Sequence, residues 1–406
     1  MMQTLLTPSI SIRQNSAYCV SVIQDCDALE LIGPELDAFL TRVQFNNNFM
    51  SFAWLRAHLT YYPPERLLII IIRDTRQQIV GLAPFKITRQ KSILLRRTIK
   101  ALSLMGSFPQ TSDYPQICID PAEDQDDILK QIAETLIAHQ RYWDVIHFLY
   151  YPDESLLLAL KQQLQLLGEH KTRINFLQDM PSLPLPDSLT SFHKNLSKRM
   201  RKNLNNIRNR LATDYPGESV QLVFESDLSK LHDLVDTFRA LNTSYWSSRK
   251  KSSVFERYKD FDSFLKNIFT AQTDDQVSSS LQFSRLMIGD RPMSFQLGVW
   301  QGNRYMAYLC NYLSEFERYK PGLLHFEMLI EDTISRGGQT FEFGRGDEAY
   351  KYLWANQDIA LWELYTCAKW IDFAEYAFYA YLKTKYRLMK PWIKQMSEKL
   401  SLKNSL

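Results

Sequence analysis

The stretch Tyr319-Lys320-Pro321-Gly322-Leu323-Leu324 links a predicted strand, Tyr305 to Asn311, to a predicted helix that begins at Pro321. Proline is preorganised for the first position of a helix and gives up no donor that the helix needs there. Gly322 allows another group to approach the backbone, and the free N–H groups of a first helical turn attract anions. An ordinary turn has the same pattern, so the stretch alone leaves both interpretations open.

The segment after this helix concentrates reactive side chains behind one short strand. Gly337 and Gly338 precede a predicted strand, Thr340 to Phe343, which is followed by Gly344-Arg345-Gly346-Asp347-Glu348-Ala349-Tyr350-Lys351. Ligands of open α/β sheets bind beyond the carboxyl ends of strands, and glycines permit the sharp turn needed there. If a helical turn follows, Asp347, Tyr350 and Lys351 share one face. A salt-bridged structural corner is the alternative.

Several enzyme classes lose support because their motifs are missing. The chain has no H-E-x-x-H, no G-x-S-x-G, no G-x-x-x-x-G-K-[ST] and no G-x-G-x-x-G. These motifs mark metalloproteases, α/β-hydrolases, P-loop proteins and Rossmann dinucleotide sites. The five cysteines form no C-x-x-C pair, so we expect neither a metal site nor a disulfide framework.

Length and charge bound the class further. A chain of 406 residues usually holds two domains, and a net charge of +3 is small for a dedicated nucleic-acid binder. Residues Met1 to Ser21 lack the pattern of a signal peptide, and the longest aliphatic run, Leu67 to Ile72, is too short to span a bilayer. We therefore expect a soluble protein in the cytoplasm.

Two halves share one order of predicted elements. Helices precede a hairpin with an Asp-containing turn in each half, and a later helix and strand follow it. In the first half the hairpin strands are Arg66 to Arg73 and Gln78 to Thr88; in the second half a meander spans Ser280 to Tyr312. Between them, Pro181 to Pro186 holds three prolines, which predicts a connector. The predicted domains are residues 1–180 and 187–406, joined by residues 181–186.

A basic helix is predicted directly after the connector. Apolar residues recur three or four positions apart from Ser188 to Thr213, and the same stretch has seven Lys or Arg residues and no acidic one. A solvated helix face usually mixes both signs. Either an anionic partner or a merely solvated face accounts for the pattern. The basic residues are Lys194, Lys198, Arg199, Arg201, Lys202, Arg208 and Arg210.

The quoted motifs resemble one enzyme family. "Y-K-P-G-L-L" followed by "F-E-F-G-R-G-D-E-A-Y-K-Y-L-W" is similar to the CelD-like group of GNAT acyltransferases, which is associated with cellulose and exopolysaccharide synthesis and related to Fem-type transferases. The resemblance covers about residues 190 to 370, and residues 1–180 match weakly through Gly81-Leu82-Ala83-Pro84 and Ser112-Asp113-Tyr114. The superfamily's donor loop, [Q/R]-x-x-G-x-[G/A], is not reproduced. The implied fold is α/β (α+β), with two GNAT-like halves in tandem, each a mixed, mostly antiparallel sheet flanked by helices.

The resemblance also implies a reaction and a site. We expect transfer of an acyl group, such as acetyl, from acyl-CoA as co-substrate to an amine or hydroxyl of a small-molecule, sugar or polysaccharide-precursor acceptor, by direct attack and with no permanently bound cofactor. Two alternatives stay open: a Fem-type transferase that uses aminoacyl-tRNA, and an inactive scaffold in a polysaccharide-synthesis assembly. The expected catalytic residues are Asp347, Tyr350 and Lys351; the expected donor-binding residues are Arg318, Lys320, Gly322, Leu323 and Leu324; the expected acceptor-binding residues are Arg201, Lys202 and Glu348, which is also an alternative base.

Overall fold

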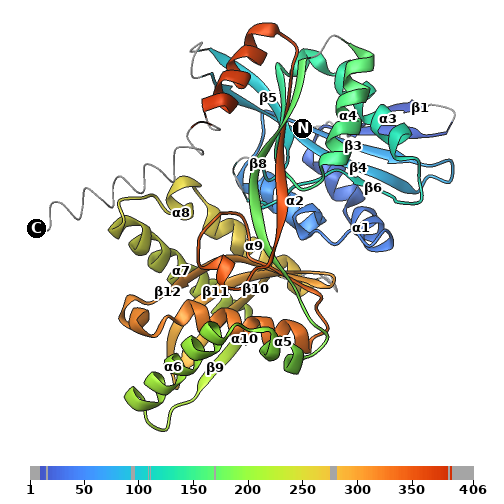
Figure 1. Cartoon of the computed structure of the whole chain (residues 1–406). Helices are drawn as coiled ribbons and strands as arrows, with labels where there is room; N and C mark the ends of the chain where they lie inside the picture. The colour runs from blue at the N-terminus through green and yellow to red at the C-terminus, as the bar shows by residue number, and fades with distance from the viewer. Residues whose placement is uncertain are drawn as a thin grey trace, which may run out of the picture.

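The computed structural model describes residues 10–14, 17–92, 97–107, 109, 111–168, 171–274, 281–382 and 385. Within these residues, 14 strands form one mixed sheet that runs through the whole molecule (Figure 1). Thirteen of them follow the order β1-β2-β3-β4-β5-β7-β14-β8-β13-β12-β11-β10-β9, and β6 pairs with β4. Helices flank the sheet in both halves, as predicted.

Both halves repeat the same succession of elements. The first half comprises β1 (Ile10–Gln14), β2 (Cys19–Ile23), α1 (Cys26–Arg42), α2 (Phe52–Tyr61), β3 (Arg66–Arg73), β4 (Ile79–Lys91), β5 (Thr98–Leu104), β6 (Cys118–Ile119), α3 (Gln125–Ala138), β7 (Val145–Tyr151), α4 (Glu154–Leu167) and β8 (Lys171–Pro184). The second half comprises α5 (Leu189–Asn195), α6 (Lys198–Asp214), β9 (Val220–Glu225), α7 (Leu228–Ser248), α8 (Val254–Arg257), α9 (Phe261–Asp274), β10 (Leu281–Ile288), β11 (Arg291–Gln301), β12 (Arg304–Tyr312), α10 (Pro321–Ser335), β13 (Thr340–Glu342) and β14 (Gln357–Cys367). Each half therefore has helices, three antiparallel strands, a helix and a strand.

Parallel pairing occurs once in each half among the described strands. β5 runs parallel to β7, and β12 runs parallel to β13, while all other pairs are antiparallel. In each case a helix, α3 or α10, lies between the two strands in the chain, as a parallel crossover requires. The predicted mixed, mostly antiparallel arrangement of strands, flanked by helices and repeated in two halves, is confirmed.

The predicted connector at Pro181 to Pro186 is wrong as local structure. Its first four residues complete β8, which pairs with β14 along its length and with β13 at its end, where Pro184 lies opposite Thr340. Proline is tolerated near a strand end because few ladder donors are needed there, and the carbonyl of Pro181 still accepts a hydrogen bond from the Phe343 N–H at 3.0 Å. The sheet continues across this segment, and the division into two domains stays a prediction.

β8 and β14 bind the two halves together. β8 leaves the first half and pairs with β13 of the second, whereas β14 ends the second half and pairs with β7 of the first. The two strands lie side by side as the long green and red ribbons between the halves in Figure 1. A strand of each half therefore pairs with a strand of the other half: β8 pairs with β13, and β14 pairs with β7.

The single long helix predicted from Ser188 to Thr213 is also wrong, because the chain breaks between α5 and α6. Leu196 has extended backbone, and the Ser197 hydroxyl caps α6 by accepting from the Met200 N–H at 3.1 Å. Serine competes for backbone donors and favours such N-caps. The apolar periodicity still faces the core on both sides of the break, through Phe192, Met200, Leu204, Ile207 and Leu211.

The predicted final helix is described only over residues 370–382 and at residue 385; the rest of it lies outside the described residues, as does much of the segment Met1 to Ser21. Within the described part of the chain, no helix combines the length and apolar character needed to cross a bilayer.

A buried lysine gives the first half a measurable pH dependence. Lys86 on β4 is 1% exposed, and its Nζ lies 2.6 Å from Nε2 of the buried His58 on α2. Burial lowers the pKa of Lys86 to about 7. The unfolded chain, with a lysine pKa of about 10.4, therefore binds more protons than the folded chain between these values, and stability rises with pH across that window.

We predict that the free energy of unfolding increases by about 3 kcal/mol between about pH 7 and pH 9.5 through Lys86, and that Lys86→Met removes this increase. Urea unfolding at the two pH values measures it. The control is Lys91→Met, at an exposed position of the same strand, which should keep the increase. An unchanged pH dependence in Lys86→Met would contradict the assignment.

Candidate functional site

A cavity opens where β12 and β13 diverge. The two strands pair only over Arg304–Met306 and Thr340–Glu342, after which β12 continues to Tyr312 and β13 ends. The register of β12 against β11 also shifts here, because Leu297 faces Leu309 and Gly298 faces Ala307, which leaves Tyr308 as the extra residue of a β-bulge. The cavity has a volume of about 340 Å³. The cavity therefore opens at a place set by the separation of β12 from β13 and by the bulge in β12.

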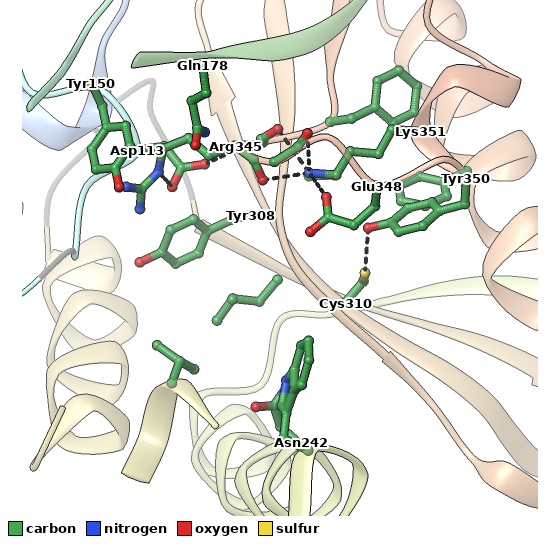
Figure 2. Close-up of a pocket in the computed structure, with 18 of the residues that line it drawn as sticks. Asp113, Tyr150, Gln178, Asn242, Tyr308, Cys310, Arg345, Glu348, Tyr350 and Lys351 are labelled. Atoms are coloured by element: carbon green, nitrogen blue, oxygen red, sulfur yellow. Dashed lines mark hydrogen bonds and ion pairs between the residues drawn. The ribbon is translucent and has the colours of Figure 1, made fainter. Parts of the chain in front are cut away.

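Both halves line this cavity (Figure 2). The first half contributes Asp113, Tyr150 and Gln178; helix α7 contributes Asn242 and Trp246. The lining combines tyrosine and tryptophan rings with charged and amide side chains, a composition that fits ligands having both apolar surface and hydrogen-bonding groups. The other lining side chains come mainly from β12 and from the turn after β13: Tyr308, Leu309, Cys310, Phe343, Arg345, Glu348, Tyr350 and Lys351.

An ion pair between the halves forms one wall. Arg345 Nε donates to Asp113 Oδ1 at 2.8 Å, and the Arg345 backbone N–H donates to Asp113 Oδ2 at 3.2 Å. The guanidinium also lies over the ring of Tyr150, 4.1 Å from its centroid. Tyr150 has a φ of 59°, a rare conformation for a side chain of its size, at the irregular end of β7. These contacts fix the turn after β13 against the first half.

Next to this pair, Tyr114 and Tyr308 connect the halves through their hydroxyls. The Tyr114 hydroxyl donates to Glu342 Oε2 at 2.7 Å, and Arg304 Nη1 donates to Glu342 Oε1 at 3.1 Å. The Tyr308 hydroxyl donates to the Thr111 carbonyl at 2.9 Å. Glu342 is fully buried, and desolvation raises its pKa. The loop 111–114 therefore packs into the second half at the point where β12 and β13 separate.

Of the three predicted catalytic residues, Tyr350 and Lys351 line the cavity and Asp347 does not. Tyr350 lines the cavity, with its hydroxyl 3.9 Å from Cys310 Sγ and its ring stacked on Phe326 at 5.9 Å between centroids. Desolvation raises the pKa of Tyr350, so its phenol keeps its proton. Asp347 is exposed and is not among the residues that line the cavity, because residues 345–350 form bends and a turn rather than the helical turn that would have aligned it with Tyr350.

Lys351 holds the turn together. Its side chain is 5% exposed, and its Nζ donates to the carbonyls of Arg345 at 2.6 Å and Gly344 at 3.1 Å. The same ammonium pairs with Glu348 Oε2 at 2.9 Å. Glu348 is half-exposed and lines the cavity, which makes it the carboxylate that the turn brings to the site. Lys351 thus positions the turn after β13 as well as lining the cavity.

The predicted donor-binding residues surround the start of α10. Lys320 precedes the helix in a left-handed conformation, no side chain caps the helix, and its first turn has no acidic residue. A Cβ on Gly322 would meet no atom within 4 Å, so the space in front of the helix is open. Arg318 pairs with Asp214 at 3.1 Å, and Leu324 is buried in the core. Leu323 is half-buried beside them.

The predicted acceptor-binding residues Arg201 and Lys202 lie elsewhere. Both are exposed on α6, outside the cavity lining. Neither has an ion pair with an acidic residue in the described part of the chain, whereas Arg208 farther along α6 pairs with Glu327 at 2.7 Å. The basic face of α6 is therefore real, but it is separate from the cavity where β12 and β13 diverge.

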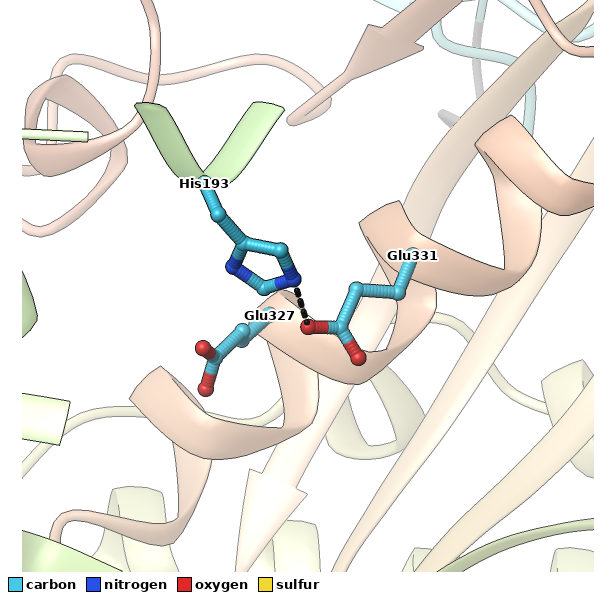
Figure 3. Close-up of side chains that lie close together, drawn as sticks. All are labelled: His193, Glu327 and Glu331. Carbon is cyan, nitrogen blue, oxygen red and sulfur yellow. Dashed lines mark ion pairs between the residues drawn. The ribbon is translucent and has the colours of Figure 1, made fainter. Parts of the chain in front are cut away.

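Three potential metal ligands meet between α5 and α10, although no motif in the sequence predicted them. His193, Glu327 and Glu331 have ligand atoms within 4.8 Å of one another (Figure 3). Each carboxylate already has a basic partner: Arg208 binds Glu327, and His193 Nε2 lies 3.2 Å from Glu331 Oε1. Burial and the charge of Glu327 raise the pKa of Glu331. The Arg208–Glu327 ion pair and the His193–Glu331 contact account for the cluster and tie α5 and α6 to α10.

Comparison with known proteins finds a family match within the second half. Residues 198–352 match the family model described as an acetyltransferase (GNAT) domain. The bulge at Tyr308, the start of α10 and most of the residues that line the cavity lie inside this matched segment, whereas Asp113, Tyr150 and Gln178 lie outside it. A sequence search of curated proteins finds no match.

Solved structures resemble the chain over most of its length. FemX shares 14% identity and a TM-score of 0.52, covering 82% of this chain and 95% of its own. The structure of L-PGS from Bacillus licheniformis shares 13% identity with a TM-score of 0.50, covering 86% and 95%. The C-terminal DUF2156 domain of a putative lysylphosphatidylglycerol synthetase from Agrobacterium fabrum shares 12% identity with a TM-score of 0.51, covering 86% and 96%. At these identities the similarity establishes the fold, and the closer resemblance to the CelD-like group stays a prediction.

Sequence reasoning missed the residues that the first half contributes. Asp113 was noticed only within Ser112-Asp113-Tyr114, and Tyr150 and Gln178 not at all. Tyr150 and Gln178 reach the cavity because β7 and β8 are next to β14 in the shared sheet, and Asp113 reaches it from the loop after β5; no local pattern encodes these neighbourhoods. The bulge at Tyr308 was likewise invisible, since it depends on the register between β11 and β12.

Gly344 tests how tightly the strands are packed at the cavity. It has a φ of 67°, and a Cβ there would lie 2.8 Å from the Ala307 carbonyl oxygen on β12. We predict that Gly344→Ala lowers the free energy of unfolding by more than the ~1–2 kcal/mol that a left-handed alanine costs, because β12 must also move. Gly337→Ala is the matched control: its φ is 79°, but its Cβ would meet nothing within 4 Å. Equal losses in urea unfolding would refute the close contact.

Proposed function

We propose that this protein transfers an acyl group from acyl-CoA to an amine or hydroxyl of a small-molecule, sugar or polysaccharide-precursor acceptor. The observation that carries the proposal is the cavity at the divergence of β12 and β13, inside the segment that matches the GNAT domain. Phe326 of α10 lines this cavity, so the same helix that offers an open N-terminus also borders the site. Donor and acceptor would meet there, held for direct attack.

A difference between the halves favours the second half as the donor site. The counterpart of α10 in the first half is α3, whose start is closed by Asp124 accepting from the N–H groups of Asp126 and Asp127. Those two residues add negative charge to the first turn, which repels phosphates. α10 has neither a capping side chain nor an acid in its first turn, so its N–H groups suit the pyrophosphate of acyl-CoA.

The chemistry assigned to the cavity is a direct transfer. The acceptor nitrogen or oxygen attacks the thioester carbon, Glu348 takes the proton that the acceptor loses, and the C–S bond breaks. The protonated phenol of Tyr350 gives its proton to the leaving thiolate. Lys351 and the Asp113–Arg345 pair hold the turn after β13 in place. We assign the role of base to Glu348 and not to Asp347, because of these two acids Glu348 lines the cavity and Asp347 does not.

We predict that Glu348→Gln lowers kcat by roughly 10²-fold, as loss of a general base commonly does, with little change in donor affinity. Asp347→Asn, a neighbouring acid outside the cavity lining, is the matched control and should retain most of the activity. Steady-state kinetics with acetyl-CoA and a panel of amine and sugar acceptors measure both. Loss of activity in Asp347→Asn alone would return the role to Asp347.

We predict that acetyl-CoA raises the melting temperature of the protein and that Gly322→Val weakens its binding at least ~10-fold, about 1.4 kcal/mol. Because a Cβ at Gly322 meets no protein atom, the variant should melt like the wild type without ligand. Any loss of binding then reports the ligand itself. Unchanged affinity in Gly322→Val would remove α10 from the donor site.

One observation favours a second candidate, transfer from aminoacyl-tRNA. Lys198, Arg201 and Lys202 stand at i, i+3 and i+4 at the start of α6, where like charges repel one another and oppose the helix dipole. An RNA backbone would compensate that cost. In the same melting experiment, a shift with charged tRNA but none with acetyl-CoA or CoA would select this candidate, and Arg201→Ala with Lys202→Ala would abolish that shift.

A further inference from the structure

The helix of residues 370–382, which follows β14, buries both of its acidic residues, packs Phe373 and Tyr376 against the core, and leaves its other large apolar residues exposed. Asp372 is 1% exposed and pairs with Arg97, and the Glu375 carboxylate accepts from the Ser92 hydroxyl at 2.6 Å. A helix on a protein surface normally turns its charged residues to water and keeps its large apolar residues on the side of the core. Both carboxylates of this helix therefore already have partners inside the protein.

The outward face is apolar throughout. Positions 370, 374, 378 and 382 follow one another at helical spacing, and residues 371 and 381 lie on the same side. The exposed fractions of the large side chains are 66% for Trp370, 52% for Ile371, 46% for Phe378, 56% for Tyr381 and 45% for Leu382. A single exposed leucine is ordinary, but a continuous stripe of this kind marks an interaction surface.

Basic residues border this apolar face. Lys171 Nζ lies 5.7 Å from the centroid of the Trp370 ring, Lys369 is exposed directly before the helix, and Arg173 is exposed on β8. The sequence after the helix is also strongly basic, since residues 383–406 contain seven Lys or Arg residues and a single acid, Glu398. Positive charge thus accompanies the aromatic face in the structure and along the chain.

We propose that the outward face of residues 370–382 docks on the surface of a lipid bilayer that contains anionic lipids. Trp and Tyr favour the boundary between headgroups and acyl chains, and lysines beside them are attracted to anionic headgroups. Protein interfaces, in contrast, are depleted in lysine. The described part of this helix, residues 370–382, is shorter than the roughly 20 residues that cross a bilayer, and its apolar outward face suits a position in the membrane surface.

The place of the helix in the fold is compatible with this docking. It lies at the end of the molecule away from α6 and β9 (Figure 1). None of the outward-facing residues lines the cavity where β12 and β13 diverge. Membrane docking is therefore independent of the proposed acyl transfer, and either can fail without the other.

Flotation of the full chain with vesicles tests the proposal. The protein should float with vesicles of phosphatidylcholine and phosphatidylglycerol in equal amounts and bind at least ~10-fold more weakly to phosphatidylcholine alone. Phe378→Glu and Leu382→Glu should each weaken binding to the mixed vesicles at least ~10-fold, because a charge enters the face that inserts. Leu31→Glu, at a leucine of α1 that is 71% exposed, is the matched control and should bind like the wild type.

Three outcomes would overturn the proposal. The first is no flotation of the wild-type chain with either kind of vesicle. The second is equal binding by Phe378→Glu and Leu31→Glu. The third is a wild-type dimer in sedimentation that Phe378→Glu converts to a monomer while vesicles have no effect, since a second copy would then cover the face. If Phe378→Glu lowers the melting temperature, Trp370→Gln replaces it as the test variant.

Discussion

The pairing of β8 with β14 is the constraint on which the rest of the structure depends. β8 belongs to the first half by its place in the chain but borders β13, and β14 belongs to the second half but borders β7. Without this pair, both halves would end in strands with unpaired backbone groups, which are costly to leave open. The pair therefore joins two similar units into one sheet and sets the position of each relative to the other.

That fixed arrangement allows residues from both halves to form one cavity. Asp113 reaches Arg345, and Tyr114 reaches Glu342, across the line where the halves meet. Ionised groups are expensive to bury, so each contact favours the one arrangement of the halves that supplies its partner. The cavity where β12 and β13 diverge is thus lined by residues of both halves, with Asp113, Tyr150 and Gln178 from the first.

The two halves have the same order of elements but differ at the helix that crosses between their parallel strands. In the first half this helix, α3, starts with two aspartates and a capping aspartate; in the second half α10 starts with proline and glycine and has no cap. A helix N-terminus with free N–H groups is positive, and one with three nearby carboxylates is not. The start of α10 is therefore the less negative of the two helix starts, although the two halves share one order of elements.

Local patterns were sufficient to predict several elements. The hairpin of β3 and β4, the meander of β10 to β12 and the start of α10 at Pro321 appear where the sequence placed them, because alternation, turn residues and helix-start signals act over a few residues. The break between α5 and α6 was missed, since the apolar periodicity runs through it and only Ser197 marks it. Pro181 and Pro184 predicted a connector because proline disfavours strands locally. In the structure, both lie in β8, because pairing with β13 and β14 outweighs this local preference.

For the site, the sequence by itself determined which residues follow β13 and that they include an acid, a phenol and an amine close together. Only the tertiary structure decided where each of these side chains lies. It turned Glu348 rather than Asp347 toward the cavity, occupied Lys351 with the carbonyls of its own turn, and brought Asp113 and Tyr150 from more than a hundred residues away. The physical reason is that a side chain's type is local information, whereas its neighbours depend on strand register and on which strands share an edge.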